Sequence, residues 1–146
     1  MAKSYNPPGI WAPFGAFSHS VLAGNGQLVF LKGQVALDAD GQIVGAGDMA
    51  AQVTQVLHNI SVCLSDLGGR MSDILSLQHI TTDIDAFLQC AEIRSKVFAP
   101  PYPVTTTMEV VSLYDRRLLV EITAIAEIPS ERLIIPDAAK DMPPAE

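Results

Sequence analysis

DMAAQVTQVLHNISVCLSDLGG, residues 48–69, decides the fold, because it reads as an amphipathic helix set among β-like segments. Its apolar residues follow the i, i+3, i+4, i+7 spacing of a helix with one buried face. They are Val53, Val56, Leu57, Ile60, Cys63, Leu64 and Leu67. Asp48 is a good N-cap residue, and Gly68-Gly69 is a typical helix stop. The stretch therefore predicts one long helix with an apolar face to bury.

The segments after this helix alternate between β-like and helical patterns. Residues 74–82 are β-like, residues 85–98 predict a second helix, and the sequence PPYP at 100–103 then breaks the chain. Two further strands are predicted at 104–111 and 118–128. The last strand is apolar on both faces, and exposed apolar surface of this kind usually marks an association site. The residues alone therefore suggest an oligomer.

The segments before the helix are short and rich in turn signals. The expected strands are residues 17–22, 27–31 and 42–44, after an irregular lead-in over residues 1–15. Asn25-Gly26 is a strong signal for a type I′ hairpin between the first two strands. Asp38-Ala39-Asp40-Gly41 predicts a second turn. The predicted order is β-β-β-α-β-α-β-β, an α+β fold whose mixed sheet carries two helices on one face.

Length and composition predict one domain, residues 1–129, followed by a tail over 130–146. The 146 residues are 49% hydrophobic, which provides enough material for a core. We expect a loose tail, with docking of Leu133-Ile134-Ile135 on a neighbour as the alternative. Cys63 and Cys90 lack metal-ligand spacing, so we expect no metal and no cofactor.

The charge and the apolar pattern exclude two classes of partner. Nine basic residues against 16 acidic ones give a net charge of −7, which opposes binding to nucleic acid. No apolar run approaches the roughly 20 residues that span a membrane. The first eight residues contain no apolar core of a signal peptide, so a cytoplasmic location is expected.

Seven short pieces occur in a recognisable order. They are Gly15–Val21, Gly33-Gln34, Gln52 with Asn59, Gly68-Gly69, Asp83 with Phe87, residues 103–110 and residues 120–126. Together they resemble the Rid/YjgF family of reactive-intermediate deaminase-like proteins, over roughly residues 12–129. The resemblance implies a chorismate-mutase-like fold. It also implies a homotrimer whose sheets form a central barrel, with small-molecule pockets between the subunits.

The resemblance implies a chemistry as well. The best-known members hydrolyse enamines and imines: an arginine in the penultimate strand binds the substrate carboxylate, and a glutamate in the last strand assists the attacking water. Glu121 matches that glutamate and is the candidate catalytic residue. The arginine position is occupied by Thr105, and a threonine cannot make the bidentate contacts of a guanidinium. We therefore expect a small unsaturated amino or imino acid, or a related metabolite, other than the usual 2-iminobutanoate-like substrates.

The remaining candidates are ligand-binding residues, and each has a structural alternative. They are Phe17, Ser18, His19, Lys32, Thr105 and Thr107. Lys32 either supplies the positive charge that Thr105 lacks or protects an edge strand from pairing with other chains. His19 either transfers protons or has a structural hydrogen bond. Trp11 either caps a pocket or fixes the lead-in to the core.

Two functions stay open at this point. In the first, Glu121 acts on a water molecule in a pocket and the protein is an enzyme. In the second, Glu121 is a charge on a solvated sheet face, and the protein is a trimer that binds small molecules without catalysing a reaction. A ribonuclease activity, sometimes attached to the family's name, conflicts with the net charge of −7.

Overall fold

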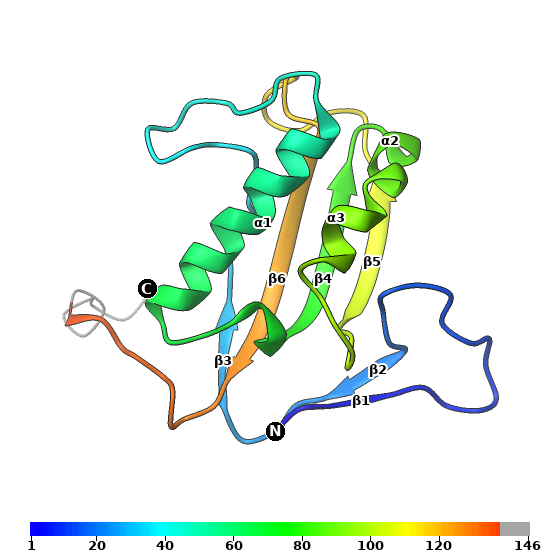
Figure 1. Ribbon diagram of the computed structural model, residues 1–146, viewed down its shortest axis with the longest axis vertical. Helices are drawn as coiled ribbons and strands as arrows, with labels where there is room; N and C mark the ends of the chain where they lie inside the picture. Colours follow the sequence, from blue (N-terminus) through cyan, green and yellow to red (C-terminus); the bar gives the residue numbers. More distant parts are fainter. Residues whose placement is uncertain (138–146) are drawn as a thin grey trace.

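The computed structural model describes residues 1–137 and shows a four-stranded sheet with helices packed on one face (Figure 1). The sheet order is β3-β6-β4-β5, with bounds Gln27–Phe30, Val120–Ile128, Ile74–Thr81 and Val104–Glu109. The β4–β5 pair is parallel, and β6 is antiparallel to both β3 and β4. The predicted α+β fold with a mixed sheet is therefore confirmed.

Helix α1 (Met49–Asp66) lies along the sheet and supplies much of the core. Asp48 caps its first turn by accepting a hydrogen bond from the Ala51 backbone N–H at 3.1 Å. The helix stops at Gly68, whose φ of +78° suits glycine. Its fully buried residues, such as Val53 and Ile60, pack with the buried residues of β6. Each such side chain contributes about 2 kcal/mol relative to exposure.

The predicted second helix is divided into α2 (Ile84–Gln89) and α3 (Ala91–Ser95). At Cys90 the backbone leaves the helical region, with φ −88° and ψ 14°. Phe87 and Cys90 are nevertheless both buried in the core. The pattern over residues 85–98 predicted one continuous helix and missed this break, because one non-helical residue does not disturb the apolar spacing.

The predicted hairpin at Asn25-Gly26 is wrong. Strand β2 (Ser20–Leu22) pairs with β1 (Lys3–Tyr5), a strand that was not predicted, and β3 pairs with β6 instead. A type I′ turn needs positive φ at both central residues, and neither Asn25 nor Gly26 has one. Glycine is required at position 26 for another reason: a Cβ atom there would lie 2.6 Å from the Ile128 carbonyl oxygen.

The second predicted turn is present, but the strand after it is not. Gly41 has φ +74°, and its N–H donates to the Asp38 carbonyl at 3.0 Å. The segment 42–44 forms only an isolated bridge between Ile43 and Leu37. The N-terminal strands therefore belong to two different sheets: β1 pairs with β2, and β3 pairs with β6. They do not form the predicted run of consecutive hairpins.

The register between the strands fixes which side chains share a face of the sheet. Successive residues of a strand point to opposite faces, and paired residues point to the same face. His79 pairs with Thr107 on one side and Ile122 on the other, and these three lie on the face covered by the helices. Ile80, the next residue of β4, pairs with Glu121. Glu121 therefore lies on the opposite face.

The described part of the predicted tail packs on its own chain. The Arg132 guanidinium forms a 2.6 Å ion pair with Asp73 and donates to the Gly68 carbonyl oxygen. The Ile134 N–H donates to the Leu67 carbonyl oxygen at 2.9 Å. Residues 138–146 lie outside the described residues. Within the described part of the chain, no helix has the length and apolar character needed to cross a membrane.

Candidate functional site

A cavity of about 720 Å³ lies between the lead-in segment, the strands β4 and β5, and the short helices α2 and α3. Its size is within the usual range for small-molecule sites. The lining is mainly apolar and aromatic, and includes Trp11, Phe14, Phe17, Leu77, Leu88 and Phe98. Ser18, His19, His79, Arg94, Thr105, Thr106 and Thr107 are the polar residues of its wall. An apolar cavity with a few polar groups is typical of a ligand site.

Strand β5 contributes two predicted residues to this cavity. Thr105 and Thr107 alternate along the strand, so both point to the helix-covered face. The Thr107 hydroxyl lies 3.0 Å from Nδ1 of His79, and the tautomer of the ring decides which of the two donates. This contact joins β4 and β5 at the cavity wall.

His79 is the most deeply buried titratable group of the wall. The residue is only 5% exposed, and its buried Nε2 has no hydrogen-bond partner in the part of the chain that the structure describes. Burial, and then the positive charge of Arg94, lower the pKa of His79 to about 4, so the ring is neutral at pH 7. A neutral imidazole with one unoccupied nitrogen can donate to or accept from a ligand, according to its tautomer.

Arg94 reaches the same wall from α3. Its guanidinium carbon lies 4.2 Å from the centroid of the Phe87 ring, a cation–π distance, and burial lowers the pKa of Arg94. Arg94 lies within the predicted second helix, residues 85–98, but was not among the predicted site residues. A charged residue at the helical spacing of Phe87 and Cys90 is the signal that could have identified it.

The lead-in segment closes the cavity with a cluster of aromatic rings. Trp11 stacks on Phe14 with ring centroids 5.5 Å apart and meets His19 edge-on at 4.2 Å. His19 Nε2 lies 2.6 Å from the Trp11 carbonyl oxygen, so this histidine also holds the segment in place. Ser18 is buried, and its hydroxyl donates to the Tyr102 carbonyl oxygen at 2.7 Å. Trp11 therefore both lines the cavity and fixes the lead-in.

Glu121 and Lys32 lie outside this cavity. A Cβ atom at Gly33 would collide with the Glu121 carboxylate, so the glycine allows that side chain to approach the backbone closely. Lys32 is exposed, and its Nζ lies 3.5 Å from the Gly33 carbonyl oxygen. Within one chain, Lys32 and Thr105 therefore do not share a cavity. Among the predicted site residues, the structure brings together Phe17, Ser18, His19, Thr105 and Thr107.

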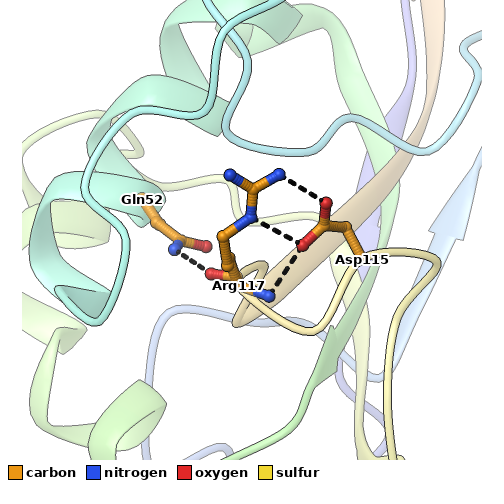
Figure 2. Close-up of polar contacts among 3 residues, drawn as sticks. All are labelled: Gln52, Asp115 and Arg117. Atoms are coloured by element: carbon orange, nitrogen blue, oxygen red, sulfur yellow. Dashed lines mark hydrogen bonds and ion pairs between the residues drawn. The ribbon is translucent and has the colours of Figure 1, made fainter.

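The start of β6, and with it Glu121, is held by Gln52 of α1. This side chain is fully buried and donates to the carbonyl oxygens of Gly45 and Arg117 at 3.0 and 2.9 Å. Its carbonyl oxygen accepts from the Leu119 N–H at 2.7 Å. Figure 2 shows Gln52 beside Arg117, whose guanidinium binds Asp115 in the same loop. The loop before β6 is thus fixed two residues before Glu121.

The described residues contain no group of three or more His, Cys, Asp or Glu side chains that could hold a metal ion. Glu121 lies on one face of the sheet, and the partly polar cavity lies on the other.

The protein therefore has an α+β fold with a cavity of about 720 Å³ on the helix-covered side of its sheet. Residues 10–128 match the family model described as Endoribonuclease L-PSP. The chain therefore belongs to this family, which is the Rid/YjgF family that its sequence resembles.

Three relatives show the extent of the similarity. A RutC family protein of Pyrococcus horikoshii is 31% identical over 114 residues, covering 78% of this chain and 88% of that protein. A crystal structure of a conserved Rid family protein from Yersinia pestis has a TM-score of 0.78 and 30% identity, covering 87% of this chain and 98% of that one. A 2-iminobutanoate/2-iminopropanoate deaminase of Dermatophagoides farinae is 25% identical over 116 residues, covering 80% and 88%.

Proposed function

We propose that the protein is an enamine/imine deaminase-type hydrolase that acts on a small unsaturated amino or imino acid at pockets shared between the subunits of a homotrimer. The observation that carries the proposal is the position of Glu121. Its carboxylate lies against Gly33 on the sheet face that the helices leave uncovered, while the cavity opens on the other face. A site that uses both needs Glu121 from one subunit and the cavity from another.

The proposed reaction consumes one water molecule and releases one ammonia. Glu121 accepts a proton from water while the water oxygen bonds to the imine carbon, and the electron pair of the C=N bond moves to nitrogen. The nitrogen takes up that proton to give the carbinolamine, and it takes up a second proton as the C–N bond breaks and ammonia leaves. The hydroxyl loses its proton to give a 2-oxo acid. An enamine first takes a proton at carbon to become the imine, and no oxidant or reductant is needed.

Two further observations support this proposal over a ribonuclease. The relative from Dermatophagoides farinae has the name of an imine deaminase, although the matching family model has the name of an endoribonuclease. Sixteen acidic residues against nine basic ones give a charge that repels RNA phosphates.

The second candidate is a homotrimer that binds small molecules without chemistry. It is favoured by Thr105, which stands where the resemblance implies the carboxylate-binding arginine of the active members.

Turnover separates the two candidates. Several imino acids are generated in situ, and release of ammonia and 2-oxo acid is followed with wild type and Glu121→Gln. The deaminase proposal predicts turnover by the wild type and a loss of about 100-fold or more in the variant. If wild type and variant are equally inert across the panel, the binding protein is the better account.

A further inference from the structure

Arg94 is a half-buried cation that has no counter-ion among residues 1–137. The ion pairs among the described residues are Lys96 with Glu92, Arg117 with Asp115 and Arg132 with Asp73, and none includes Arg94. Burial lowers the pKa of Arg94, because loss of hydration disfavours the charged guanidinium. A partly desolvated guanidinium at a cavity wall is stabilised by an anion in that cavity.

A second, independent feature at the same wall is His79. The residue is 5% exposed, its Nδ1 contacts the Thr107 hydroxyl, and its Nε2 is buried with no partner among the described residues. Buried polar nitrogens are nearly always hydrogen-bonded, so this one calls for an explanation. His79 lines the cavity, and a polar group of a ligand bound there would supply the missing hydrogen bond to Nε2.

Phe87 contacts both groups. The Arg94 guanidinium lies over the ring at 4.2 Å, and the His79 ring centroid is 5.1 Å from that of Phe87. Phe87 is fully buried, so its ring is held by the core. The remaining wall is largely apolar, with Leu77 and Phe98 beside the two polar groups.

We propose that Arg94 binds the carboxylate of a small monocarboxylic acid in this cavity, with His79 and Thr107 as its polar neighbours and the aromatic wall around the apolar body of the ligand. The assignment deepens the proposed function and rests on it, because the proposed function is what makes this cavity a substrate pocket. It gives the role of the carboxylate-binding cation to Arg94 rather than to Lys32, which does not line the cavity.

Calorimetric binding of benzoate and of its neutral analogue benzamide tests the assignment without any turnover. We expect wild type to bind benzoate more tightly than benzamide. Arg94→Gln should weaken benzoate binding tenfold or more, about 1.4 kcal/mol per decade, and leave benzamide binding unchanged. Arg94→Lys should restore part of the preference, and thermal melting should show that both variants are folded.

Two matched variants serve as controls. Lys96→Gln removes an exposed cation at the end of α3 and should bind benzoate as wild type does. Lys32→Met removes the alternative cation and shows which of the two cations gives the preference for benzoate. The assignment is overturned if wild type does not prefer benzoate, if Arg94→Gln retains that preference, or if Lys32→Met abolishes it. An equal loss of benzoate and benzamide binding in Arg94→Gln also overturns it. The deaminase proposal can fail while this assignment holds: the wild type would then prefer benzoate to benzamide but release no ammonia from any imino acid.

Discussion

Glu121 and Thr107 lie on opposite faces of one sheet, although their register partners are adjacent residues of strand β4. Glu121 is the register partner of Ile80, and Thr107 is the register partner of His79. The proposed catalytic carboxylate and the cavity are therefore separated by the thickness of the sheet in one chain. Association of subunits is the arrangement that lets them act together.

The uncovered face of the sheet should be a subunit interface. Ile125 of β6 and its register partner Phe30 of β3 lie on this face, and Phe30 is 70% exposed. We expect wild type to sediment at about three times the chain mass of 15.6 kDa. Ile125→Glu places a charge in this interface and should give monomers. The control, Val62→Glu on the exposed side of α1, should remain trimeric; a trimeric Ile125→Glu would contradict the prediction.

Gly33→Ala should impair turnover by displacing the Glu121 carboxylate. The added methyl would collide with that side chain, so Glu121 must move by several tenths of an ångström or more. Displacements of this size commonly reduce a catalytic rate by about 100-fold. Gly9→Ala is the matched control, because no atom lies within 4 Å of a Cβ there. Equal ammonia release by Gly33→Ala and wild type would show that the position of Glu121 is not critical.

His79 should make the protein less stable in mild acid. Burial lowers the pKa of His79 to about 4 in the folded chain. In the unfolded chain His79 is protonated below about pH 6.5, whereas in the folded chain it stays neutral until the pH approaches 4. Stability is therefore complete above pH 6.5 and falls as the pH drops from 6.5 towards 4, by about 1.4 kcal/mol per pH unit.

The matched variant for this prediction is His79→Gln, which stays neutral over that range. Chemical denaturation of wild type and variant at pH 7.0, 6.0 and 5.0 should show the steeper decline in wild type. Parallel declines would mean that His79 titrates normally in the folded protein.

Gln52→Leu should destabilise the fold through the loop before β6. The change leaves the Arg117 carbonyl oxygen, drawn in Figure 2, and the Leu119 N–H without the Gln52 side chain as partner. The Gly45 carbonyl oxygen loses one of two hydrogen bonds, because it also accepts from the Asp48 N–H. One unsatisfied buried group costs about 1–3 kcal/mol, so we expect a loss of about 3 kcal/mol and a clearly lower Tm. Asp115→Asn, which breaks the exposed ion pair of the same loop, should leave the Tm nearly unchanged. Equal melting of Gln52→Leu and wild type would contradict the role given to Gln52.

The sequence predicted those parts of the fold that depend on local patterns. Helix α1 was predicted from its apolar spacing, its Asp48 cap and its glycine stop, all of which lie within one segment. Strand β1 was missed because its partner, β2, follows 15 residues later and the pairing leaves no local pattern. Gly26 gave a false hairpin signal because its role is close approach to Ile128, a residue distant in sequence.

The candidate site shows the same division. Alternation within β5 predicted that Thr105 and Thr107 point the same way, and both line the cavity. Their relation to Glu121 depends on the register of β4 with both neighbours, which no single segment encodes. Arg94 was missed because the cavity is assembled from the lead-in, β4, β5, α2 and α3, five segments that meet only in the folded chain.

Complementation between two inactive variants tests most directly whether the site is shared between subunits. Glu121→Gln removes the carboxylate, and Thr105→Phe fills the cavity on the other face of the sheet; the two proteins are unfolded together, mixed equally and refolded. If each site takes Glu121 from one subunit and its cavity from the next, about a quarter of the sites in the mixed trimers are intact, and ammonia release should return to that fraction of the wild-type rate. A refolded mixture as inactive as its two parents would contradict the account.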